Sequence, residues 1–347
     1  MTVDLAGFVL EHFGVQVELA GGVIDAVRLA FLKQRLGVKC EDDIDQIVEY
    51  LRADNVSPVS NSALVEKLLM AVVLEEEDLA IQYLNLCKQA LEFDYELSGV
   101  MARKSRHQSK ATAVLRVIVK KSLASHRTKP SASLVENVKL NDEDLFETPV
   151  FDSKQENPKL SELECCVLLA NAMFIARFET KDDVQVEKIE AYCQCVLECS
   201  QDSTITWMAL YLRSLNEMER MKYQRRCSQQ LVALCDSLHL IESELFFVLV
   251  LPSRRDLFLL TAQSLINVGD YKRAAGIFTS INQMYKAAVC LVNLNDHVGA
   301  VDILEKNYTH DKCDFESMCL LGDLTRNQNL FEEAWERSGK QYFPALR

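Results

Sequence analysis

The sequence predicts an all-α protein, an α-solenoid of stacked antiparallel helical hairpins. Hydrophobic residues make up 49% of the 347 residues, which supplies enough apolar surface for a core. Glycine and proline are scarce, with 11 Gly and 6 Pro, whereas a chain of many short strands needs more tight turns. Apolar side chains recur at helical spacing along most of the chain, and a two-helix pattern repeats toward its C-terminus.

The clearest hairpin lies between Phe258 and Ile281. Gly269 and Asp270 separate its two helices, because glycine readily adopts the left-handed conformation that ends a helix and aspartate caps the next one. The small side chains of Ala262 and Ala274 let two antiparallel helices approach closely. The apolar positions at helical spacing are Phe258, Ala262, Leu265 and Ile266 on the first helix, and Tyr271, Ala274, Ile277, Phe278 and Ile281 on the second.

The turn and small-residue positions of this hairpin recur twice. Ala300 follows Ala274 after 26 residues, and Ala334 follows Ala300 after 34 residues. The second interval, and a tight turn followed by Tyr, Ala and Phe, resemble the tetratricopeptide repeat (TPR). The first interval is short, so residues 284–304 are expected to form a degenerate hairpin, and an ordinary helical bundle with coincidental spacing is the alternative. The positions assigned to the repeat signature are Ala262, Gly269, Tyr271, Ala274, Phe278, Ala300, Leu321, Gly322 and Ala334.

Three regions are expected along the chain. Residues 1–121 form an N-terminal helical region that ends in a basic segment. Residues 122–160 carry three of the six prolines, several serines and an acidic stretch, which is typical of a polar linker. Residues 161–347 form the solenoid, with TPR-like repeats at about 254–347. The amphipathic helices expected before these repeats are Val23–Leu36, Asp43–Leu51, Ala63–Leu74, Leu79–Leu91, a helix capped by the box Ser161 to Glu164, Val184–Cys199 and Thr206–Glu219.

The segment 103–129 carries nine positive charges and no acidic residue. This density of positive charge could bind nucleic-acid phosphates. However, no aromatic side chain lies within the segment to stack on bases, and the whole chain has a net charge of -13. The favoured interpretation is that the apolar run Ala113–Val119 packs as a helix or strand while the charges stay solvated or pair with acidic neighbours. The candidate basic patch is Arg103, Lys104, Arg106, Lys110, Lys120 and Lys121.

The twelve cysteines are scattered through helical patterns as small apolar residues, which favours a reducing compartment. A zinc site at Cys193, Cys195 and Cys199 is the alternative, but no Cys-x-x-Cys pair or nearby histidine completes it. No catalytic motif occurs either, so we expect no enzyme activity, no cofactor and no metal. The N-terminal residues lack the basic start of a signal peptide, and no apolar run is long enough to span a membrane. The expected location is the cytoplasm, with the nucleus as an alternative.

The run Ser98 to Leu115, SGVMARKSRHQSKATAVL, resembles the Leu-Thr-Gly-x-x-Gly-Lys-Arg-Thr-x-x-Gln element of the tetratricopeptide repeat protein 27 family. Ala102 stands where that family has its second glycine. The C-terminal stretch is the most specific, with Cys319 to Asp323 as Cys-Leu-Leu-Gly-Asp and Ala334 to Ser338 as Ala-Trp-Glu-x-Ser. Further similar stretches, in the same order over about residues 80–347, are Leu140–Asp144, Met208–Leu215 and Phe258–Ile281; Phe343–Arg347 departs from the family's usual ending.

The resemblance implies the N-terminal and central portion of a non-enzymatic protein-interaction scaffold, before a longer repeat array. It implies protein partners bound through the solenoid groove, in an assembly or co-chaperone-like role; the alternative is a nucleic-acid-associated factor that uses residues 103–129. No membrane partner is expected. TPR domains that hold the C-terminal carboxylate of a heat-shock chaperone carry Lys and Asn on their first helices. The corresponding positions here are Leu259, Gln263, Tyr285, Val289, Cys319 and Asp323, which supply no cation.

Overall fold

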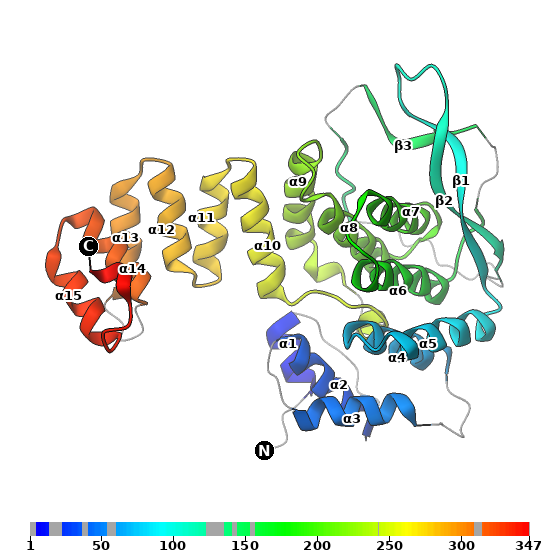
Figure 1. Ribbon diagram of the computed structural model, residues 1–347, viewed down its shortest axis with the longest axis horizontal. Helices are drawn as coiled ribbons and strands as arrows, with labels where there is room; N and C mark the ends of the chain where they lie inside the picture. Colours follow the sequence, from blue (N-terminus) through cyan, green and yellow to red (C-terminus); the bar gives the residue numbers. More distant parts are fainter. Residues whose placement is uncertain are drawn as a thin grey trace. The chain divides into compact units, whose positions relative to one another are not determined.

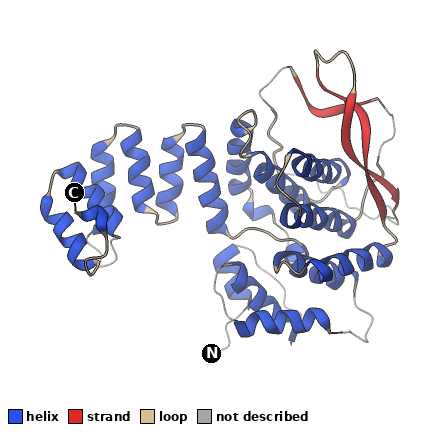
Figure 2. Cartoon of the chain, in the orientation of Figure 1, coloured by secondary structure: helices blue, strands red, loops and turns tan. Residues whose placement is uncertain are grey.

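The computed structural model describes residues 5–13, 23–36, 41–53, 60–122, 135–140, 144–152, 157–241, 243–308 and 314–346. The chain divides into two compact units, residues 1–254 and 255–347, which are taken in turn below. Helices dominate both units, so the predicted helical solenoid architecture is confirmed (Figure 2). The first unit also contains a three-stranded sheet, which the all-α prediction did not include.

The helices of the first unit pack mostly against their neighbours in sequence, as expected for stacked hairpins (Figure 1). Helices α2 and α3 pair, α4 and α5 pair, and α6 to α9 form a continuous series in which each contacts the next. Trp207, fully buried on α8, donates its indole N–H to the carbonyl of Leu234 on α9. The bounds are α1 Leu5–Phe13, α2 Val23–Arg35, α3 Glu41–Arg52, α4 Asn61–Val73, α5 Glu77–Ala90, α6 Glu162–Phe178, α7 Asp183–Cys199, α8 Ser203–Glu217 and α9 Gln224–Asp236, followed by the 3₁₀ turns η1 Leu238–Leu240 and η2 Ser243–Val248.

Side-chain caps fix where the central helices begin. The capping box predicted at the start of α6 is present: the Ser161 hydroxyl accepts from the Glu164 N–H, and the Glu164 carboxylate accepts from the Ser161 N–H. Asp182 caps α7 and Asp202 caps α8, each by accepting an N–H three residues on. These caps satisfy backbone donors that would otherwise lack partners at the helix starts.

The sheet has the order β2-β1-β3 and is antiparallel throughout, with β1 Asp94–Ser105, β2 Thr112–Lys121 and β3 Leu145–Phe151. Valines are well suited to a pleated, half-buried surface, and Val114, Val117 and Val119 of β2 are buried. Tyr95 of β1 accepts a hydrogen bond from the buried amide of Asn171 on α6, which ties the sheet to the helices. Much of the basic segment therefore folds as a β-hairpin. Its apolar run, Ala113–Val119, forms a strand and not a helix.

Strand β3 lies within residues 122–160, which the sequence analysis assigned to a linker. Its backbone groups pair with β1, so this part of the segment is ordered by a partner strand rather than by its own composition. Residues 123–134, 141–143 and 153–156 of the same segment lie outside the described residues. Asn157, just beyond, donates to the Val117 carbonyl and accepts from the Val119 N–H, at 2.8 and 3.1 Å. Its amide thereby occupies part of the outer edge of β2.

The second unit consists of helical hairpins with short turns (Figure 1). Gly269, at φ +80°, ends α10, and the Asp270 carboxylate caps α11 by accepting from the Arg273 N–H, as the sequence predicted. Gly322 lies so close to the ring of Phe331 that an added Cβ would stand 2.6 Å from it. The bounds are α10 Arg254–Asn267, α11 Tyr271–Ser280, α12 Met284–Asn293, α13 His297–Tyr308, α14 Phe315–Thr325, α15 Gln328–Arg337 and the 3₁₀ turn η3 Phe343–Ala345.

Candidate interaction surfaces

Most residues assigned to the repeat signature are buried in the second unit, whereas Gly269 is exposed in a turn. Ala262, Ala274, Ala300 and Ala334 have no exposed surface. Ala300 joins a cluster with Ala288, Leu304, Leu321 and Leu330, which connects α12, α13, α14 and α15. Phe278 is buried as well, Tyr271 is half-buried, and Gly322 allows the close approach of Phe331. These positions therefore hold the helices together and leave binding to other side chains.

The helices of the hairpins present both apolar and charged side chains at their surface. On α10 and α12, Leu259, Tyr285 and Val289 are half-buried apolar or aromatic side chains. On α11, α13 and α15, the exposed residues are mainly polar or charged; they include Lys272, Arg273, Asp302, Glu305, Glu332, Glu336 and Arg337. Of the other three positions compared with the carboxylate-binding TPR domains, Gln263 and Asp323 are exposed, Cys319 is buried, and none is a cation. Partly exposed apolar side chains occur on the second helices too, including Val298 of α13, which is 75% exposed.

Half of the candidate basic patch is paired with carboxylates. Lys104 reaches Glu187 on α7 at 2.8 Å. Lys120 pairs with Glu96, and the next residue, Lys121, pairs with Glu92, each at 2.6 Å. Arg103, Arg106 and Lys110 are exposed at the far end of the hairpin. The structure therefore spreads the six positive charges along both strands and the turn, with acidic neighbours between them, rather than gathering them on one face.

The cysteines of α7 are core residues. Cys193, Cys195 and Cys199 are all buried, and burial raises the pKa of the Cys193 thiol to about 12. A hydrogen bond between Cys195 and Cys199 raises the pKa of the first and lowers that of the second. Within the described ranges, no group of three or more His, Cys, Asp or Glu side chains is placed to hold a metal ion.

We expect the purified chain to carry no stoichiometric zinc. Zinc needs deprotonated thiolates, and burial disfavours the charged form of Cys193. Elemental analysis of protein dialysed against buffer without chelator should find well under one zinc per chain, and a chelator should leave the helical circular-dichroism signal unchanged. One equivalent of zinc, lost together with helicity on chelation, would overturn this assignment of the cysteines.

A pocket of about 690 Å³ opens at the ends of α6, α7 and α8. Its rim carries two ion pairs in solvent, Lys181 with Glu219 at 2.6 Å and Arg220 with Asp183 at 3.7 Å. Exposed pairs of this kind are weak and solvated. The rim therefore does not present the converging titratable groups of a catalytic centre.

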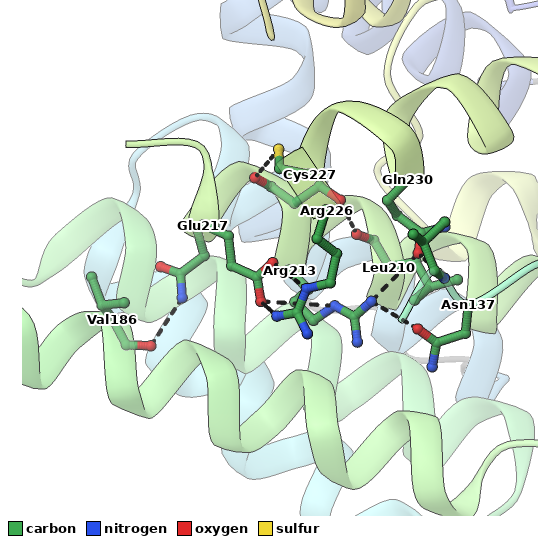
Figure 3. A network of polar contacts seen from close by, with 11 residues as sticks. Asn137, Val186, Leu210, Arg213, Glu217, Arg226, Cys227 and Gln230 are labelled. Carbon is green, nitrogen blue, oxygen red and sulfur yellow. Dashed lines mark hydrogen bonds and ion pairs between the residues drawn. The ribbon is translucent and has the colours of Figure 1, made fainter. Parts of the chain in front are cut away.

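A buried polar network lies between α8 and α9 and was not foreseen from the sequence (Figure 3). Arg226 of α9 donates to both carboxylate oxygens of Glu217, and both side chains are buried. Burial raises the pKa of Glu217, while the charges of Arg226 and Arg213 oppose that shift. Arg213, one turn before Glu217 on α8, donates to the side-chain oxygen of Asn137 at 2.8 Å. Residues 135–140 are thereby joined to the helical series.

Part of this network could have been found in the sequence. Arg213 and Glu217 are the charged residues of α8 and stand four residues apart, a spacing that places them on one face. Their partners could not be found the same way. Arg226 comes from the next helix, and Asn137 comes from a segment about 76 residues earlier in the chain, so only the fold brings them together.

Among the described residues, no helix is both long enough and apolar enough to cross a membrane. No known family profile matches the chain, and no solved structure matches it. Its sequence is 25% identical over 330 residues to a TPR repeat-containing protein of Schizosaccharomyces pombe, covering 78% of this chain and 40% of that protein.

Two further relatives show the same pattern. The chain is 22% identical over 311 residues to the tetratricopeptide repeat protein 27 homolog of Dictyostelium discoideum, covering 85% of this chain and 36% of that protein. It is 20% identical over 392 aligned positions to the Saccharomyces cerevisiae protein named essential for maintenance of the cell wall protein 1, covering 94% and 42%. The chain thus spans about two fifths of the length of these relatives. The stacked hairpins and these similarities thus support a TPR family like that of tetratricopeptide repeat protein 27, to which the chain is similar over most of its length.

Proposed function

We propose that this chain is a non-enzymatic protein-interaction scaffold that binds a partner segment through the first helices of its C-terminal hairpins, α10, α12 and α14. The observation that carries the proposal is the stacking of the helical hairpins, since stacked repeats expose an extended surface along one set of helices. Leu259, Tyr285 and Val289 are half-buried on the first helices and offer apolar contact area there. Protein interfaces are depleted of charge at their cores and enriched in aromatic and apolar side chains.

The chemistry of this surface favours an apolar or amphipathic partner segment. A free carboxylate would meet no lysine or arginine at the six clamp positions, and Asp323 would repel it. An acidic chaperone tail is therefore a poor ligand for residues 254–346, and any assembly or co-chaperone-like role would use a different kind of contact. We place this activity in the cytoplasm, where thiols stay reduced.

The test is affinity capture from cells with matched charge variants. Replacing Leu259→Glu and Val289→Lys puts opposite charges into the proposed contact surface, and Lys272→Glu with Asp302→Lys makes the same exchange on the second helices. We expect Leu259→Glu with Val289→Lys to reduce recovery of the partner about tenfold or more, which corresponds to the loss of about one hot-spot contact. Lys272→Glu with Asp302→Lys should leave recovery unchanged.

Hydrogen exchange of each variant provides the control for folding, and an acidic tail peptide serves as a probe that should not bind. Equal recovery by both double variants, with folding intact, would contradict the proposed surface. Micromolar binding of the acidic peptide, abolished by amidating its C-terminus, would contradict the proposed chemistry.

A further inference from the structure

Residues 135–140 form neither helix nor strand, yet one side chain holds their backbone at two points. The Gln230 amide donates from Nε2 to the Glu136 carbonyl at 2.7 Å, and its Oε1 accepts from the Val138 N–H at 2.9 Å. This carbonyl and this N–H flank Asn137, and in an extended chain two such groups point the same way. Gln230 therefore binds the segment as a neighbouring β-strand would.

Two side chains of the segment are recognised besides its backbone. Val135 is buried, with 5% of its surface exposed. The side-chain oxygen of Asn137 accepts from Arg213 Nη2 at 2.8 Å (Figure 3). Asn137 is exposed apart from this contact, as are Glu136 and Lys139. The pattern that is read is an apolar β-branched residue, at which the chain bends, then any residue, and then a hydrogen-bond acceptor.

The groups that read this pattern are fixed on rigid elements. Gln230 is buried on α9, and its Oε1 also lies 3.4 Å from Arg213 Nη2. Arg226, one turn earlier on α9, is held by Glu217 of α8. We call the pair Gln230 and Arg213 the clamp. A preorganised clamp loses little conformational freedom when it binds an extended peptide, which is the condition for useful affinity.

We propose that the clamp on α8 and α9 is a binding site for an extended segment of a partner protein, and that residues 135–140 are a resident segment which such a partner displaces. The partner segment carries Val or Ile and, two residues later, Asn or Asp. Because main-chain bonds to Gln230 do not depend on sequence, an incoming segment can replace them one for one. An aspartate should bind more tightly than the resident Asn137, since a carboxylate accepts a charge-assisted bond from Arg213.

The experiment titrates a fluorescent, end-blocked peptide with the sequence of residues 133–140 into the full chain. In an opened variant, Val135→Ser with Asn137→Ser, the resident segment should compete less. We expect the peptide to bind this variant about tenfold more tightly than wild type, because occupancy of a site by a competitor lowers apparent affinity by the free fraction. A peptide with Asp at the position of Asn137 should bind several-fold more tightly still.

Two controls separate the clamp from non-specific binding. Methylating the peptide nitrogen at the position of Val138 removes the donor to Gln230 and should abolish binding without any change in the protein. Gln230→Ala in the opened variant should do the same, whereas Gln229→Ala should not. No binding by the opened variant, or equal binding of the N-methylated peptide, would overturn the proposal.

A measurement on wild-type protein keeps the test independent of how the variants fold. With the Asp-containing peptide in excess, hydrogen exchange of residues 135–140 should accelerate as they leave the clamp. Unchanged exchange with the peptide bound elsewhere would overturn the proposal. A dimer whose copies exchange this segment would assign the site to a second copy instead of a partner protein and would also overturn it. None of these outcomes depends on the surface proposed for α10, α12 and α14.

Discussion

Replacing Glu217 by alanine should lower the free energy of unfolding of the first unit by about 3–5 kcal/mol, the loss expected when one member of a buried ion pair is removed. The guanidinium of Arg226 would then be left buried without the carboxylate that accepts its Nε–H at 3.1 Å. Breaking such a pair costs more than the pair itself contributes, because the remaining charge keeps its desolvation penalty.

The measurement uses the two tryptophans of the chain, Trp207 and Trp335, which lie in different units. In a Trp335→Phe background, the fluorescence of buried Trp207 on α8 reports unfolding of the first unit alone. Denaturant titration should show a large loss for Glu217→Ala and little change for Glu219→Ala, whose exposed carboxylate pairs with Lys181 in solvent. The double variant Glu217→Leu with Arg226→Met should be more stable than Glu217→Ala, since it leaves no Arg226 charge buried. Equal stability of the Glu217 and Glu219 variants would show that the buried pair has no structural role.

Replacing Ala274 by tryptophan should unfold the hairpins of the second unit. Ala274 has no exposed surface, and an indole at this position forces the backbones of packed helices apart. Because each hairpin of a repeat array is stabilised by its neighbours, the damage should spread from α11 into α12 and α13. Hydrogen exchange should show lost protection over these helices, while the first unit keeps its protection.

Gly276 of the same helix is the matched control. An added Cβ there meets no atom within 4 Å, and the residue is exposed in a helix interior. Gly276→Ala should therefore stabilise the second unit by about 0.5–1 kcal/mol, since alanine loses less backbone entropy than glycine in a helix. Protection that is unchanged in Ala274→Trp would contradict the packing of these hairpins.

The helices and hairpin turns were predictable because their signals are local. Gly269 and Asp270 specify a turn through their own backbone preferences, and the alanines mark close helix contacts. The four alanines at repeat positions, Ala262, Ala274, Ala300 and Ala334, have no exposed surface. The same local reasoning also located the capping box at Ser161 and Glu164.

The sheet depends on contacts that no local pattern reveals. The run Ala113–Val119 is compatible with helix or strand, and its strand form is fixed by β1 and by Asn157, about 40 residues further along the chain. Strand β3 forms in a segment with the composition of a linker because β1 offers it an edge. The contact between the clamp and residues 135–140 could not be predicted either, because Gln230 and Glu136 are 94 residues apart in the sequence.

The most direct test of the proposed scaffold is site-specific photo-crosslinking in cells. A benzophenone amino acid placed at Leu259 or at Val289 should crosslink to one and the same partner protein, because both positions lie on first helices of the C-terminal hairpins. The same probe at Lys272, exposed on a second helix, should give no crosslink to that partner. A partner that crosslinks from Lys272 but from neither Leu259 nor Val289 would contradict the account.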